Sequence, residues 1–205
     1  MIKILDSNKN IFNKKLDQFL LNRKNKTEFN STLVKKIIKE VKKNGDKAIL
    51  KYEKKFNKNN IIIPSSKKIN KIISTLDIKV KKAIDLAYNR IYKFHSMQKI
   101  KNISYKDKLN NKLDYKFIPI ESVGIYVPGS IVSYPSSVLM NAIPAIIAGV
   151  SRLVMINPGR KGNQNAAVLY AAKKCKISEI YSIGGPAAIA GIAYGTKKIK
   201  KVDKI

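Results

Sequence analysis

Tryptophan is absent from this 205-residue chain, and cysteine and histidine occur once each, as Cys175 and His95. A single cysteine cannot form an internal disulfide, which argues against a disulfide-stapled secreted fold and favours a reducing, cytoplasmic location. One cysteine and one histidine also exclude a zinc finger, because such a site takes about four Cys or His ligands. We therefore expect a cytoplasmic protein held by a hydrophobic core, and the length allows one large or two small domains.

Acidic residues are scarce, with 13 Asp and Glu against 42 Lys and Arg and a formal net charge of +29. Such a balance can indicate nucleic-acid binding. Only four of the cations are arginines, whose forked guanidinium suits base and phosphate recognition: Arg23, Arg90, Arg152 and Arg160. The abundant lysine accompanies abundant Asn and Ile, as AT-rich codons would produce on a solvated surface. We favour this interpretation, and keep a basic nucleic-acid-binding protein as an alternative that one continuous basic face would support.

Charged residues are missing from 122 to 151, a stretch long enough to span a membrane. Its content argues against that, because Pro128, Pro135 and Pro144, with several glycines and serines, would leave backbone groups unsatisfied in lipid. The first residues have no sustained apolar core, so we expect no signal peptide and no membrane partner.

The N-terminal part has the apolar period of helices. We treat residues 1–25 as a polar lead with a short helix near 12–21, and residues 26–120 as the mainly helical first part of an incomplete α/β domain. Within it we predict helices from 30 to Gly45, over 46–56 and 69–76, and a longest helix at 78–98. After a polar loop, Leu113, Tyr115 and Phe117 alternate as in a strand.

From residue 121 the pattern changes to short apolar strands separated by helices. We predict strands at 122–127, 152–157 and 178–183, helices at 137–149, 164–175 and 186–195, and a further strand beginning at 202. This order implies right-handed crossovers and a parallel sheet. The fold class predicted is α/β, with a Rossmann-like parallel sheet and flanking helices over residues 121–205.

Two strand-to-helix junctions could hold a ligand, because open α/β sheets bind at the carboxyl ends of their strands, and we expect the two junctions to lie beside each other where the loops converge. At the first, Tyr126 offers a ring and a hydroxyl, and Gly129 would let the backbone approach a cofactor closely. The second junction, 183–187, suits an anion at a helix N-terminus, although its glycine spacing is a weak signal. From pattern alone, a packed tyrosine in an ordinary tight turn is the favoured interpretation of the first junction. We interpret His95 and Cys175 as structural, since neither has a partner at catalytic or metal-ligand spacing.

Long segments of the chain, loops included, are similar to histidinol dehydrogenases: ESVGIYVPG, YPSSVLMNAIPA, IAGIAYGT and KVDKI, with GDKAILKYEKKFNK and NRIYKFHSMQK nearer the N-terminus. The resemblance implies the N-terminal portion of an NAD-dependent, zinc-requiring, homodimeric enzyme that oxidises L-histidinol to L-histidine through the aldehyde. It implies that Tyr126 contacts NAD and that Asp203 and Lys204 brace the end of the sheet. The zinc ligands and the catalytic Glu-His pair of the family would lie beyond Ile205, so we expect no catalytic or metal-binding residue in this chain.

Two positions depart from the family pattern. Ser130 replaces the second glycine of the first junction, and Ala187 replaces a glutamine that the resemblance places on NAD. A catalytically inactive, truncated remnant of the enzyme therefore remains an alternative.

Overall fold

A parallel sheet organises the C-terminal half of the protein, as seen in a computed structural model that describes residues 7, 11–129, 133–159 and 163–205, with the side chains of 22–31 left out. Its strands are β3 (Ser122–Tyr126), β4 (Arg152–Ile156) and β5 (Glu179–Tyr181), in the order β3-β4-β5. Each strand is a short apolar segment that is covered on both faces, as is usual for parallel sheets.

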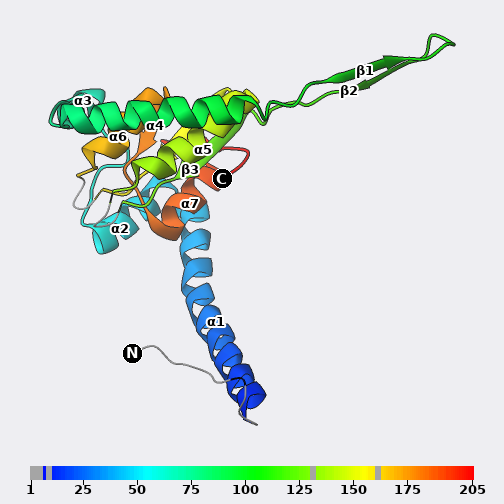
Figure 1. The fold of residues 1–205 in the computed structure, drawn as a ribbon. Coiled ribbons are helices and arrows are strands. Elements are labelled where there is room, and N and C mark those ends of the chain that lie inside the picture. Colours follow the sequence, from blue (N-terminus) through cyan, green and yellow to red (C-terminus); the bar gives the residue numbers. More distant parts are fainter. Residues whose placement is uncertain (1–6, 8–10, 130–132, 160–162) are drawn as a thin grey trace.

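Side chains alternate between two hydrophobic cores on opposite faces of the sheet, because successive residues of a strand point to opposite sides. On one face, Ile125, Met155 and Ile180 pack with α3 (Ser66–Ser74), α4 (Ile78–Ser96), α5 (Pro135–Ala148) and α6 (Ala166–Lys174). On the other face, Val154 and Ile156 pack with α1 (Phe12–Asn44), α2 (Asp46–Asn57) and α7 (Gly185–Tyr194). The predicted α/β fold, with helices on both faces, is confirmed (Figure 1).

The direction of winding changes at β3. The chain passes from β3 through α5 to β4 and through α6 to β5, both on the first face, and then crosses the second face through α7. It returns beside β3, where the Gly124 N–H donates to the Lys204 carbonyl over 2.9 Å and Val123 pairs with Lys204 in parallel. The carboxyl end of β3 is therefore a topological switch point, where open α/β sheets bind ligands.

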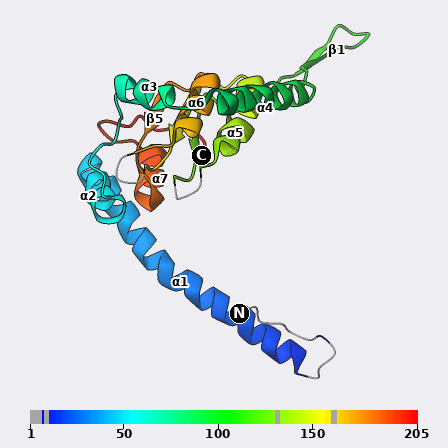
Figure 2. The same ribbon diagram turned by 60° about the vertical axis from the view of Figure 1, so that its left-hand side comes forward.

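Helix α1 corrects the prediction for the N-terminal region. A single helix of 33 residues runs where we predicted two, and it is longer than α4, which has 19. Neither glycine nor proline interrupts residues 12–44, and Gly45, with a φ of 51°, is the first residue suited to end the helix. The N-terminal part of α1 extends well away from the sheet (Figures 1 and 2).

A β-hairpin replaces the single strand predicted near residue 113. Strand β1 (Ile103–Lys106) pairs antiparallel with β2 (Lys112–Tyr115), so the polar loop in our prediction contains the partner strand and the turn. In the turn, Asp107 accepts the N–H groups of Leu109 and Asn111, each over 2.8 Å. All residues of both strands are exposed, and the hairpin projects from the body of the molecule (Figure 1).

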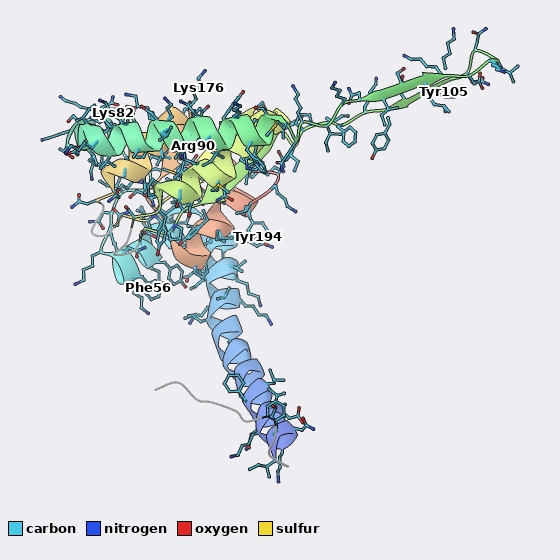
Figure 3. The ribbon with its side chains drawn as sticks, in the orientation of Figure 1. Phe56, Lys82, Arg90, Tyr105, Lys176 and Tyr194 are labelled. Carbon is cyan, nitrogen blue, oxygen red and sulfur yellow. The ribbon has the colours of Figure 1, made fainter. Side chains whose placement is uncertain are left out.

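Basic side chains occur on α1, α2, α3, α4 and α6 and on the hairpin, and they are not gathered on one element. Figure 3 shows Lys82 and Arg90 along α4 and Lys176 just beyond α6. Because α3, α4 and α6 cover one face of the sheet and α1 and α2 the other, the basic side chains are spread over the molecule, which counts against the nucleic-acid-binding alternative. Within the described residues, no helix is long and apolar enough to cross a membrane.

Candidate functional site

Three loops converge at the carboxyl edge of the sheet, one after each strand. A Cβ atom on Gly129, in the loop after β3, would lie 1.4 Å from the carbonyl oxygen of Pro158, in the loop after β4. A Cβ atom on Gly184, in the loop after β5, would lie 2.7 Å from the Cβ atom of the same proline. Both glycines are therefore required by direct loop-to-loop packing. For Gly129 this differs from the predicted reason, which was close approach to a cofactor.

Tyr126 joins the two junctions that the sequence singled out. Its half-buried ring packs against the core formed with α2 and α7, and its hydroxyl accepts the N–H of Gly185 over 3.2 Å. Gly185 is exposed and has a φ of 64°, a conformation that favours glycine. The expected meeting of the first junction with the start of α7 is thus present in the structure.

Most of the amides at the start of α7, where the sequence suggested an anion site, are engaged within the protein. The Gly184 N–H donates to Glu53 over 2.7 Å, and the Gly185 N–H is taken by Tyr126. Pro186 has no N–H to give, and the Ala188 N–H points back to the Gly184 carbonyl. Of the amides that could hold a phosphate at this helix N-terminus, those of Gly184 and Gly185 are therefore already engaged by side chains from α2 and β3.

Glu53 is a site residue that our sequence reasoning missed. It is 1% exposed, and its two carboxylate oxygens accept from the Asn57 side-chain amide at 3.0 and 2.9 Å. Burial raises the pKa of the Glu53 carboxyl above its ordinary value, and the hydrogen bonds from Asn57 and Gly184 lower that pKa in part. The sequence pattern could have indicated that Glu53 is buried, because it lies four residues after Ile49 on the buried face of α2.

Asn157 ties the loops after β3 and β4 together. Its buried side-chain amide donates to the Val127 carbonyl over 3.0 Å, and its backbone carbonyl accepts from Gln164 over 3.1 Å. The Asn157 Oδ1 atom and the Ser182 hydroxyl are both buried and have no hydrogen-bond partner within the described part of the chain. Two unsatisfied polar atoms thus lie just past the ends of neighbouring strands, which suits a site that takes a polar ligand or water.

Other candidates lie apart from this edge. His95, near the C-terminal end of α4, contacts Gln98 with 2.6 Å between Nδ1 and Oε1. Cys175 is 2% exposed, and burial raises the pKa of its thiol to about 11, which agrees with a packing role and not with a reactive thiolate. Asp203 accepts from the Ser122 N–H over 3.0 Å and so braces the start of β3, as expected.

Of the two departures from the family pattern, Ala187 lies within the described residues. Ala187 is 2% exposed within the α7 core, so a longer side chain there would have to displace neighbouring atoms. The other departure, Ser130, lies outside the described residues.

Where the structure describes side chains, no group of three or more His, Cys, Asp or Glu residues is placed to hold a metal ion, so the described His, Cys, Asp and Glu residues do not fit zinc.

Comparison with known proteins gives a consistent result. A family model for histidinol dehydrogenase matches residues 21–205. Histidinol dehydrogenase from Pelagibacter ubique is 76% identical over 205 residues, which are all of this chain and 48% of that protein. The Brucella abortus (strain 2308) enzyme is 40% identical over 198 residues, which are 95% of this chain and 46% of the relative.

A solved structure agrees with these sequence relatives. The crystal structure of histidinol dehydrogenase from Elizabethkingia anophelis superposes with a TM-score of 0.81 at 35% identity, over 85% of this chain and 41% of that one. The chain thus spans less than half the length of the relatives it matches. With a family model that matches 21–205, this chain belongs to the histidinol dehydrogenase family.

Proposed function

We propose that this chain is the N-terminal portion of a histidinol dehydrogenase and supplies part of the NAD site used to oxidise L-histidinol to L-histidine through the aldehyde. The observation that carries the proposal is the contact of Tyr126 with the start of α7 at the switch point of the sheet. A bound NAD would accept the hydride. Tyr126 would orient the cofactor through its ring and hydroxyl, and the packed loops would exclude water on that side.

The remaining parts of the proposal rest on family membership and on separate observations. Zinc belongs to the proposed whole enzyme, with ligands outside this chain, so the chain alone should not oxidise L-histidinol. A homodimer is supported by the apolar side chains of the projecting hairpin, since Tyr105 and Leu113 are 58% and 64% exposed. A cytoplasmic location is supported by the single cysteine, which is buried and free.

Binding of NAD to the purified chain tests the proposal. Isothermal calorimetry should detect weak binding, and Tyr126→Phe should weaken it by about two- to tenfold, the loss expected for one hydrogen bond. Tyr194→Phe is the matched control, because this tyrosine lies at the other end of α7, beneath Lys42, and is half exposed (Figure 3). Equal effects of the two substitutions, or NAD reduction by the chain with L-histidinol, would contradict the proposal.

An inactive remnant of the enzyme is the second candidate, and Ala187 favours it. The methyl group at this position cannot make the hydrogen bond that the resemblance assigns to glutamine. Absence of NAD binding in wild type, in Tyr126→Phe and in the control alike would favour this candidate over the first.

A further inference from the structure

Glu53 brings a carboxylate into the interior of a protein whose charge is mostly positive. It is 1% exposed, and among the described residues no lysine or arginine forms an ion pair with it. Its partners are neutral groups, the Asn57 amide, the Gly184 N–H and the Asn59 side chain. Burying a carboxylate without a cation is costly, so stability alone is a poor reason for its presence.

The position of the carboxylate suggests another reason. Gly184 is the N-cap of α7, and its N–H is buried, so it needs an acceptor from elsewhere in the fold. Gly184 itself cannot provide a capping side chain, because the Pro158 ring occupies the space that its Cβ would take. Glu53 supplies the acceptor across 131 positions of sequence.

The contact between Glu53 and the Gly184 N–H lies directly beside the amide that meets Tyr126. The Gly185 N–H follows directly and donates to the Tyr126 hydroxyl from the exposed side of the turn. Two consecutive amides are thus held by side chains from different elements, Glu53 of α2 and Tyr126 of β3. We propose that Glu53 is a positioning residue for the cofactor site, which fixes the Gly184–Gly185 turn so that Gly185 faces Tyr126. This inference rests on the proposed function only where NAD binding is concerned.

Amide hydrogen exchange by NMR, together with NAD titration, tests the role in wild type, Glu53→Gln and Glu53→Ala. The Glu53→Gln variant keeps an oxygen acceptor for the Gly184 N–H, so its exchange rates and its NAD affinity should match those of wild type within about twofold. The Glu53→Ala variant should accelerate exchange at Gly184 and Gly185 about tenfold and weaken NAD binding several-fold. Exchange of the β4 amides, from Val154 to Ile156, should be unchanged in the alanine variant.

Glu40→Ala is the matched control, because Glu40 joins α1 to α2 through Lys51 and Tyr52 without touching the turn. Unchanged exchange at Gly184 in Glu53→Ala would overturn the inference. Equal acceleration in β4 would also overturn it, since that result means general destabilisation. If wild type binds no NAD, the proposed function fails, and exchange at Gly184 and Gly185 still decides whether Glu53 positions the turn.

Discussion

Substituting Gly129 by alanine should separate two loops of the candidate site. The added Cβ would lie 1.4 Å from the Pro158 carbonyl oxygen and 2.5 Å from its carbon, both backbone atoms that no rotamer change can move. An ordinary contact is at least about 3.5 Å, so one loop has to move by about 2 Å. A shift of that size breaks the polar contacts between Asn157 and the backbone of Val127 and Pro128.

The energetic consequence follows from the surroundings of Asn157. Its Oδ1 atom is already without a partner in the described part of the chain, so the shift would leave the whole buried amide unsatisfied. We expect Gly129→Ala to lower the free energy of unfolding by about 1–3 kcal/mol, the cost of an unpaired buried polar group. Urea denaturation followed by far-ultraviolet circular dichroism measures this difference.

Gly185→Ala is the comparison, because its added Cβ has no atom within 4 Å apart from its chain neighbours and its own helix backbone, so the cost there comes from the positive φ. That cost is about 1 kcal/mol, and it should leave the Asn157 contacts intact. The Asn157 side-chain amide resonances should therefore shift in Gly129→Ala and stay in place in Gly185→Ala. An unfolding free energy for Gly129→Ala within about 0.5 kcal/mol of wild type would refute the packing argument, since that is the range of an ordinary surface substitution.

Two further predictions concern ionisation. Arg152 donates to both Glu179 oxygens over 2.7 Å and holds the pKa of that carboxyl below its usual 4.5. The pair therefore stabilises the fold at pH values above 4.5 and loses this contribution as the pH falls through the lowered pKa. The Glu179→Gln variant should therefore have a lower free energy of unfolding than wild type at pH 7, and the difference should shrink in acid. A difference in unfolding free energy that stays constant across urea titrations at several pH values would contradict this. Cys175, with its pKa raised to about 11, should resist iodoacetamide at pH 8 in the native protein and react once unfolded, as mass spectrometry can show.

The sheet could be predicted because its signal is local and repeated. Short apolar segments such as those around Ile125 and Val154 alternate with helices, and the connection rules leave few ways to assemble them. The meeting of Tyr126 with Gly185 also followed, since parallel strands end at one edge. The NAD contact of Tyr126 came from resemblance, and it stays a prediction.

The missed features depend on long-range packing or on the absence of a stop signal. The break predicted within α1 came from its polar composition, whereas a helix continues through polar residues until a breaker such as Gly45 ends it. The first hairpin strand was missed because it has only four residues, all of them exposed, so its alternation of Ile103 and Tyr105 is too short to indicate a strand. Glu53 was missed because its partner, Gly184, lies 131 positions away.

Pro158 gives the candidate site a property that neither pattern nor resemblance indicated. Gly129 and Gly184 approach this one residue from opposite loops, so the spacing of the loops is set by contacts within the protein. Glu53 and Tyr126 then hold consecutive amides of the turn without any ligand. A cofactor that reaches this edge would meet a turn already ordered, and little of its binding energy would be spent on arranging it. Substitutions of Pro158 or Glu53 that disorder the turn should therefore weaken the binding of a ligand that contacts neither residue.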